Sequence, residues 1–299
     1  MERLRCGVIG VGVLGRGIVM SLVRAKLSVL AYDLDPEAAG AAADAGAGVS
    51  ESVAQLASRT DVVLLVLPDT PEILGIADDL AAGLSQGSAV LVVSTVSPET
   101  PIELDRRLRP LGIDVLDCPI SGGPSRAEAG ELAVMVGGDP AAFARVRPVL
   151  EAIGGEVVHI GPLGHGQIAK LANNLMGAVI VEAIAEGLAL AAKAGADVPR
   201  VASAIASGSG SSWLLQEWIP ETVFRGDYER RFSLDLMCKD MRLVAELADR
   251  LEVPIPACEV ARATFERAVA SGYGGDDFSR AVELHARGAG TQLGGSTPV

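Results

Sequence analysis

Residues 5–15 read RCGVIGVGVLG, a short apolar run that leads directly into glycines at positions 10, 12 and 15. This order is typical of a β-strand that turns tightly into an α-helix. The first glycine permits the turn, the second lets the backbone approach a pyrophosphate, and the third lets the helix pack closely on the strand. The amino end of the helix favours the anion. The sequence therefore predicts a dinucleotide site made by Gly10, Val11, Gly12, Val13, Leu14 and Gly15.

A carboxylate follows this turn in the next predicted strand. Asp33 ends the run VLAY over 29–32, about twenty residues after the glycines, where it would accept hydrogen bonds from the adenine ribose hydroxyls. The same charge would repel a 2′-phosphate, and Leu34 stands where a phosphate site would have Arg or Lys. We therefore expect NAD as the cofactor, with NADP the weaker candidate. The alternative role for Asp33 is a charge at the start of the helix that begins near Pro36.

The first half of the chain alternates short β-branched runs with alanine-rich helical stretches. Short strands separated by helices indicate βαβ units and a mostly parallel sheet. Aromatic residues make up only 3% of the chain, so small and aliphatic residues must build the core, which suits a helix-covered sheet. The expected strands are 5–9, 28–32, 62–67, 89–93, 114–117, 133–137 and 157–159. The expected helices include 14–25, 36–45, 53–58 and 98–111.

The pattern changes at the glycine-rich turn over 161–166. The next stretch, 167–194, is apolar on nearly all sides, so it is predicted to be one long helix that must be covered on all sides. Further helices are expected over 198–207, 212–223, 234–251, 257–271 and 278–287. The predicted fold class is α/β, with an N-terminal Rossmann-type doubly wound parallel sheet joined by the long helix to a C-terminal all-α domain. The expected domains are 1–163 and 164–290, with 164–194 as the interdomain helix and 291–299 as a flexible tail.

The charge balance argues against several classes of partner. With 25 Lys and Arg against 38 Asp and Glu, the 299-residue chain carries a formal charge of −13, which repels nucleic acid and anionic membrane surfaces. The four cysteines and three histidines lie far apart, so no metal site is predicted and the cysteines are expected to be buried reduced thiols. The chain starts without a secretory pattern, and the most apolar stretch, 171–181, is too short to span a bilayer, so a cytoplasmic protein is expected.

The strongest candidate for proton chemistry lies in the run GHGQIAKLANN over 164–174. Lys170 and Asn174 are four residues apart, so they share one face of the predicted long helix. Burying an idle ammonium costs several kcal/mol, so a lysine on a helix that is otherwise apolar needs a partner. The alternative, which the spacing leaves open, is a lysine that reaches solvent at the helix end.

Four ordered segments together resemble the β-hydroxyacid dehydrogenase family, and the resemblance covers nearly the whole chain. They are GVIGVGVLG over 7–15, DCPISGGP over 117–124, GHGQIAKLANN over 164–174 and LMCKDM over 236–241. The resemblance implies that Lys170 is the catalytic lysine, that Asn174 assists it, and that Lys239 closes over the cofactor. It also assigns residues that line the nicotinamide side, Leu67, Pro68 and Thr95, and residues that bind the substrate, Ser121, Gly122, Gly123 and Trp213.

Physical reasons support part of this assignment. Thr95 and the pair Leu67-Pro68 follow apolar strands, at the sheet edge where α/β proteins bind ligands, and a structural turn is the alternative for Leu67-Pro68. The two glycines of the segment SGG over 121–123 expose successive backbone N–H groups and the serine adds a hydroxyl, which suits a carboxylate. Pro124 removes one N–H from this segment. For Trp213, plain core packing is the alternative.

By this resemblance the chain is an NAD(P)-dependent oxidoreductase that transfers a hydride between the nicotinamide and a small 3-hydroxy acid, such as 3-hydroxyisobutyrate, or the matching semialdehyde. Lys170 is its general acid and base. The alternatives are a dinucleotide-binding interaction module without catalysis and an imine reductase on the same scaffold. Asn173, where 6-phosphogluconate dehydrogenases carry His, argues against a phosphorylated sugar acid. The apolar long helix predicts a homodimer or homotetramer, because a monomer would leave much of it in water.

Overall fold

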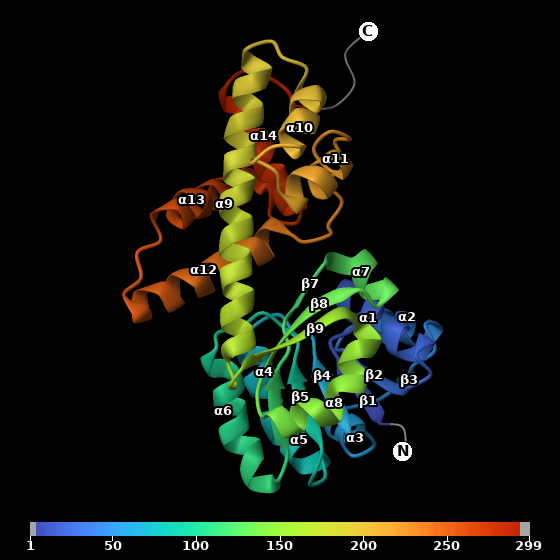
Figure 1. Cartoon of the computed structure of the whole chain (residues 1–299). Coiled ribbons are helices and arrows are strands. Elements are labelled where there is room, and N and C mark those ends of the chain that lie inside the picture. The colour runs from blue at the N-terminus through green and yellow to red at the C-terminus, as the bar shows by residue number, and fades with distance from the viewer. Residues whose placement is uncertain (1–3, 294–299) are drawn as a thin grey trace. The chain divides into compact units, whose positions relative to one another are not determined.

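The computed structural model describes residues 4–293 and divides into two compact units, one that ends at Lys170 and one that begins at Leu171 (Figure 1). The first unit is a sheet covered by helices, and the second is built of helices. The division falls inside one long helix. Each unit is therefore described by itself.

A nine-stranded sheet organises the first unit. Its strands are β1 (Arg5–Ile9), β2 (Ser28–Tyr32), β3 (Gly48–Val49), β4 (Val62–Leu65), β5 (Ala89–Val92), β6 (Asp114–Asp117), β7 (Ile120–Ser121), β8 (Leu132–Gly137) and β9 (Gly154–Gly161). Their order is β3-β2-β1-β4-β5-β6-β8-β7, with β9 paired to β8. The strands from β3 to β6 are parallel, whereas β8 runs antiparallel to β6 and β7. The order reverses between β1 and β4, which is the kind of switch point where open α/β sheets bind ligands.

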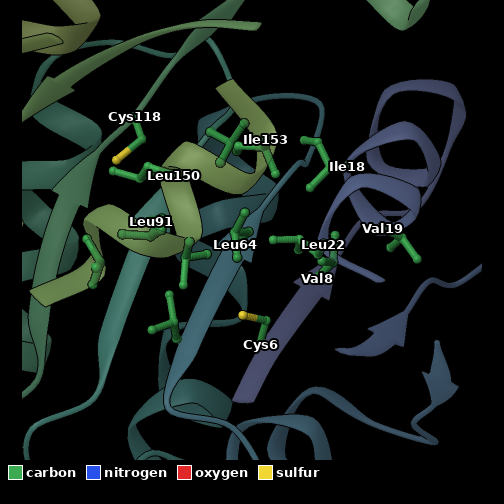
Figure 2. Packing of buried hydrophobic residues seen from close by; sticks show 14 of the residues in the cluster. Cys6, Val8, Ile18, Val19, Leu22, Leu64, Leu91, Cys118, Leu150 and Ile153 are labelled. Atoms are coloured by element: carbon green, nitrogen blue, oxygen red, sulfur yellow. The ribbon is translucent and has the colours of Figure 1, made fainter. Parts of the chain in front are cut away.

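Helices connect these strands and cover the sheet (Figure 1). They are α1 (Val13–Arg24), α2 (Pro36–Asp44), α3 (Val53–Ala57), α4 (Thr70–Gly75), α5 (Ala77–Gly83), α6 (Glu99–Leu108), α7 (Gly123–Ala129) and α8 (Pro140–Ile153). Successive residues of each central strand enter different core clusters, so Leu64 of β4 packs in one and Leu65 in the other. Figure 2 shows the first cluster, which contains Leu64 of β4 together with Ile18 and Leu22 of α1 and Leu150 of α8. The sheet is thus buried on both faces, as parallel sheets require.

The second unit packs around the long helix α9 (His165–Lys193), whose first turn belongs to the sheet unit. The helices that follow are α10 (Val198–Ala206), a π-helical turn over Leu214–Trp218, α11 (Ile219–Glu221), α12 (Leu234–Leu251), α13 (Pro256–Ala268), a second π-helical turn over Val269–Tyr273, a 3-10 turn over Phe278–Ala281 and α14 (Val282–Gly288). Their core includes Phe265, Met241 and Leu234, which are fully buried.

The predicted fold class is confirmed, and most expected elements are present with small shifts at their ends. The differences have local causes. The helix expected over 257–271 ends as α13 at Ala268 and continues as a π-helical turn, because Gly272 adopts φ +90° there. The helix expected over 212–223 is instead a π-helical turn over Leu214–Trp218 that is followed by α11. The strands β3 and β7 contain two residues each, too few to leave a periodic signal in the sequence.

Exposure bears on two of the expectations. Within one chain the long helix keeps part of its apolar surface in water, with Met176 61% exposed and Leu190 74% exposed, as the sequence led us to expect of a single chain. The predicted flexible tail begins at 291, but the Thr291 N–H donates to the Ala286 carbonyl and Leu293 is buried. The rest of that tail, 294–299, lies outside the described residues. Among the described residues, α9 is the helix that is long and apolar enough to cross a membrane. The core helix of a soluble protein can have the same length and hydropathy.

Candidate active site

The glycine turn after β1 has the geometry that a pyrophosphate requires. Gly10 adopts φ +88°, and a Cβ there would lie 2.2 Å from the carbonyl oxygen of Val66. A Cβ on Gly15 would lie 2.0 Å from the carbonyl oxygen of Gly10, so the helix packs directly on the turn. A Cβ on Gly12, the N-cap of α1, would meet nothing within 4 Å. The backbone at Gly12 is therefore open to a ligand at a helix N-terminus, and the residues fit a dinucleotide.

Asp33 lies directly after β2 and reaches back to this turn. Its Oδ2 accepts the backbone N–H of Val11 at 2.7 Å, and its Oδ1 accepts the N–H of Asp35 at 3.0 Å. Asp35, with its Oδ1 2.9 Å from the Glu37 nitrogen, is the N-cap of α2, so Asp33 is not the capping side chain, but its bond to the Asp35 N–H places its charge beside the start of that helix. Leu34 is 88% exposed beside Asp33.

The exits of β4 and β5 lie next to each other at the same edge of the sheet, because the two strands are parallel neighbours. The Leu67 N–H donates to the hydroxyl of Ser94 at 2.8 Å, and that hydroxyl donates to the Leu65 carbonyl. Pro68 is exposed and Thr95 is half-buried beside this contact. The structure thus brings the expected nicotinamide residues to neighbouring loops, joined through a serine to which the sequence analysis gave no role.

The two glycines after β7 adopt backbone conformations with positive φ. Gly122 adopts φ +132° and Gly123 adopts φ +76°, which L side chains rarely do. Ser121 ends β7, and α7 begins at Gly123 with Pro124 in its first turn, so one N–H is missing there as expected. A Cβ on Gly122 would lie 2.8 Å from Cδ of Arg126, whose side-chain stem therefore lies against the glycine. Arg126 therefore carries a positive charge beside a segment predicted to hold an anion, a role that the sequence motif alone does not predict.

The first turn of α9 is anchored on a buried carboxylate. Asp117, the last residue of β6, is fully buried, with its Oδ1 accepting the Gly164 N–H and its Oδ2 accepting the Gln167 N–H, each at 2.7 Å. Burial raises the pKa of this carboxyl above its ordinary value, and the backbone N–H groups of Gly164, Gln167 and Gly166 act in the opposite direction. The quoted segments contain both Asp117 and Gln167, but nothing in their spacing predicts this contact.

Lys170 and Asn174 both lie on α9 and both are buried, with exposed fractions of 9% and 7%. Four residues of helix bring them to the same face. The alternative, in which Lys170 reaches solvent at the helix end, is therefore wrong.

A second cluster links Asn174 to the predicted cofactor lysine. The Asn174 Nδ2 donates to Asp240 Oδ2 at 2.6 Å, and the Lys239 Nζ lies 3.0 Å from Asp240 Oδ1. Asn173 Nδ2 donates to Asn174 Oδ1 at 3.0 Å. Asp240 is 1% exposed, so this carboxylate is held between an amide and an ammonium inside the helical unit. No spacing rule in the sequence predicts a role for Asp240, and the signal that could have pointed to it is its position directly after Lys239.

Trp213 lies in the helical unit at the start of the first π-helical turn and is 46% exposed. Its ring centroid is 5.5 Å from that of Trp218, which packs in turn against Phe278. The Trp218 Nε1 donates to the buried Asp277 at 2.9 Å, which fixes the second ring. Trp213 is therefore supported on one side by an ordered aromatic group and open to solvent on the other.

The four cysteines are free thiols, as expected, although Cys238 is only half-buried. Burial raises the pKa of Cys6 to about 12 and that of Cys238 to about 11. It also raises the pKa of Cys118 and Cys258. All four thiols are thus protonated at neutral pH and are poor nucleophiles. Within residues 4–293, no group of three His, Cys, Asp or Glu residues is arranged to hold a metal ion.

Both halves of the chain match known protein families. Residues 5–161 match the NAD-binding domain of 6-phosphogluconate dehydrogenase, and residues 164–285 match the NAD-binding domain of NADP-dependent 3-hydroxyisobutyrate dehydrogenase. The chain belongs to the β-hydroxyacid dehydrogenase family. It is 36% identical to an L-threonate dehydrogenase of Cupriavidus necator over 93% of this chain and 95% of that protein.

Solved structures of related enzymes have the same fold as this chain. A 3-hydroxyisobutyrate dehydrogenase from Salmonella typhimurium is 33% identical, covers 94% of this chain and 99% of that one, and superposes with a TM-score of 0.85. A 3-hydroxyisobutyrate dehydrogenase of Mycobacterium tuberculosis with L-serine is 30% identical, covers 95% and 99% of the two chains, and has a TM-score of 0.87. The protein is therefore an oxidoreductase that acts on hydroxyl groups with NAD(P), and the alternatives of a non-catalytic module and an imine reductase are set aside.

Proposed function

We propose that this β-hydroxyacid dehydrogenase interconverts a small 3-hydroxy acid and its semialdehyde, with Lys170 as the general acid and base. The observation that carries the proposal is the burial of Lys170 on the same helix face as Asn174, one turn after the helix leaves its anchor on Asp117. A buried lysine that shares its face with an amide is suited to exchange a proton rather than to be solvated.

The chain's own residues would handle the proton and the oxygen. In oxidation, neutral Lys170 takes the proton of the substrate hydroxyl, and in reduction its ammonium returns that proton to the developing alkoxide. Asn174 holds the same oxygen or keeps the lysine in line, and its own Nδ2 is held by Asp240. The nicotinamide, when bound, supplies the acceptor or donor of the hydride.

The substrate's carboxylate is assigned to the segment Ser121, Gly122 and Gly123. Two consecutive glycines with positive φ have no side chains of their own beside their N–H groups, and the Ser121 hydroxyl adds a donor. Arg126 adds a positive charge against Gly122. Trp213 is assigned to the substrate side and Lys239 to the cofactor, as the family resemblance implies.

NAD is the proposed cofactor, with NADP the weaker candidate. Gly10, Val11, Gly12, Val13, Leu14 and Gly15 would hold the pyrophosphate, and Leu67, Pro68 and Thr95 would line the nicotinamide. Asp33 would bind the ribose hydroxyls and repel a 2′-phosphate, and the exposed neighbour Leu34 offers no positive charge to offset that repulsion. For the chain as a whole we propose domains 1–163 and 164–290, a cytoplasmic location and a homodimer or homotetramer.

A panel of substrates tests the function. L-threonate, 3-hydroxyisobutyrate, L-serine and glycerate, each assayed with NAD⁺ and with NADP⁺, present the same carboxylate and a nearby carbinol with different substituents. Reduction of the nicotinamide with one of them, at least tenfold faster than with the others in kcat/KM, identifies the substrate. Absence of turnover with every 3-hydroxy acid, in either direction and with either cofactor, contradicts the proposal.

A further inference from the structure

We propose that Gln167 is a positioning residue that sets where Lys170 stands relative to the loops at the carboxyl edge of the sheet. The inference rests on the proposed role of Lys170 as acid and base. The Gln167 side chain is completely buried in the sheet unit. Its Oε1 accepts the Val96 N–H at 3.1 Å and its Nε2 donates to the Ser94 carbonyl at 2.8 Å. One amide thus pairs with a donor and an acceptor of the loop after β5, more than seventy residues earlier in the chain.

The same amide also reaches the loop after β4, through Ser94. The Ser94 hydroxyl accepts the Leu67 N–H at 2.8 Å and donates to the Leu65 carbonyl at 3.2 Å. The loops that carry Leu67 and Thr95 are therefore fixed to each other by Ser94 and to the first turn of α9 by Gln167. These loops are the ones assigned to the nicotinamide side, so Gln167 connects the helix of the lysine with the cofactor-facing edge.

Asp117 holds the other side of the same helical turn. Its carboxylate accepts the N–H groups of Gly164 and Gln167, each at 2.7 Å. The helix approaches the sheet so closely that a Cβ on Gly166 would lie 2.5 Å from the Met135 carbonyl oxygen, and a Cβ on Gly137 would lie 2.8 Å from the Gly166 nitrogen. The backbone of residue 167 is thus fixed by Asp117, and its side chain is fixed by the β5 loop.

This double fixation bears on Lys170 because the two residues are three positions apart on one helix and share a face. A helix clamped at Gln167 by its backbone and its side chain has a defined rotation and rise at Lys170. Displacement of a reacting group by about 1 Å can cost on the order of 100-fold in rate. An apolar side chain of the same size would fill the volume without burying an amide, so packing alone does not account for a glutamine here.

The test compares two variants that each lose buried side-chain hydrogen bonds. Gln167→Met keeps the shape of the side chain and removes both of its bonds, and we expect kcat to fall about 10- to 100-fold. The KM of the hydroxy acid and the dissociation constant of NAD⁺ should stay within about threefold, because the binding loops keep their own contacts. The control is Thr60→Val, which removes the buried bond from Thr60 Oγ1 to the Leu56 carbonyl before β4, at the opposite edge of the sheet. Its melting temperature should fall similarly, with kcat unchanged.

A second variant keeps the proposal testable where Gln167→Met folds poorly. In Gln167→Glu the carboxyl group can still accept the Val96 N–H, and once protonated it can donate to the Ser94 carbonyl as the amide does. Its kcat, expressed relative to the parent at each pH, should therefore rise as the pH falls. Two charged groups act on this carboxyl. Asp117, which accepts the backbone N–H of residue 167, favours its protonation, whereas Lys170, three residues further along the same helix face, favours its charged form when it carries an ammonium.

Three outcomes overturn the inference. They are a kcat of Gln167→Met within twofold of the parent, an equal loss of kcat in Thr60→Val, or a loss that adds in full to that of Lys170→Ala. Full additivity would mean that Gln167 acts independently of the lysine. Failure of the underlying function is distinguishable, because Lys170→Ala would then keep parental activity whatever Gln167→Met does.

Discussion

The carboxylate of Asp33 accepts the backbone N–H of Val11 at 2.7 Å, which ties the end of β2 to the glycine turn after β1. The residue expected to choose between NAD and NADP therefore also holds the turn that would carry the pyrophosphate. A substitution at this position acts on both features unless the new side chain keeps an acceptor for Val11.

The first prediction separates the negative charge of Asp33 from its role as a hydrogen-bond acceptor for Val11. In the double variant Asp33→Asn with Leu34→Arg, the amide oxygen still accepts the Val11 N–H, while the negative charge is lost and a positive charge is gained. We expect the ratio of kcat/KM for NADP⁺ to that for NAD⁺ to rise at least tenfold in steady-state assays. Asp33→Ala, which loses the acceptor, should weaken binding of both cofactors. A parent enzyme that already prefers NADP⁺ would contradict the assignment.

Replacing the proposed acid and base should remove turnover without removing the cofactor. General acid–base catalysis typically contributes about 10²–10⁴-fold, so Lys170→Ala should lose at least about 100-fold in kcat. Lys170→Arg should be little better, because a guanidinium does not give up its proton. Titration of protein fluorescence with NADH should give a dissociation constant close to that of the parent. Activity within a few-fold of the parent in either variant would refute the role.

Asp240 gives a prediction about the helical unit. Its carboxylate lies between Asn174 Nδ2 and Lys239 Nζ and is 1% exposed, so Asp240→Asn leaves an amide facing an amide and an ammonium. We expect the free energy of unfolding in urea to fall by about 1–3 kcal/mol, together with a loss of kcat. Asp249→Asn, at an exposed position near the end of the same helix α12, is the matched control and should change neither quantity. Equal stability of the two variants would argue against a buried charged cluster.

The pair Arg5 and Asp61 gives a prediction about pH. Hydrogen bonds from the Arg5 side chain lower the pKa of the Asp61 carboxyl below its ordinary value of 3.8. Because the pKa is lower in the folded state, the pair stabilises the protein above the unfolded pKa, and the contribution is lost as the pH falls through the folded value. Both side chains are partly exposed, so we expect Asp61→Asn to cost at most about 1 kcal/mol at pH 7. The difference from the parent, measured by urea unfolding, should shrink toward pH 3.

Sequence patterns predicted the long, periodic elements well. The helix expected over 234–251 has those bounds in the structure as α12, because its apolar face repeats over five turns and Ser233 caps its start. The short helices α4 and α5 lack such a repeat, and they are specified by a capping box at Asp69 and by packing of Ile73 and Leu80 in the core. Elements of this length take their definition from the surrounding fold.

In the candidate site, too, features made by residues close in sequence could be predicted, and contacts between distant residues could not. Local motifs predicted the glycine turn and the face shared by Lys170 and Asn174, because the relevant residues are close in sequence. Asp240 and Gln167 could not be found in this way, because their partners lie 66 and 71 residues away. Contacts at such separations depend on which elements pack together, and a single sequence carries no spacing rule for them.

The uncovered side of α9 leads to the prediction about assembly. Met176, Ala183, Gly187 and Leu190 are all exposed, and the first, second and fourth of these are spaced by seven residues, so they form one stripe along the helix. Side chains repeated at this interval pack well against a second helix, and small residues at 183 and 187 allow close approach. Leaving the stripe in water would create an apolar surface of the kind that marks a protein interface.

We therefore expect light scattering at micromolar concentration to give at least twice the 30.7 kDa mass of one chain. The double variant Met176→Glu with Leu190→Glu should return the mass of a single chain, because two charges would be buried at the interface without partners. The control is Leu111→Glu, which places the same charge at a 47% exposed leucine of the sheet unit and should leave the assembly intact. An active parent that scatters as a monomer would mean that α9 keeps this stripe in water.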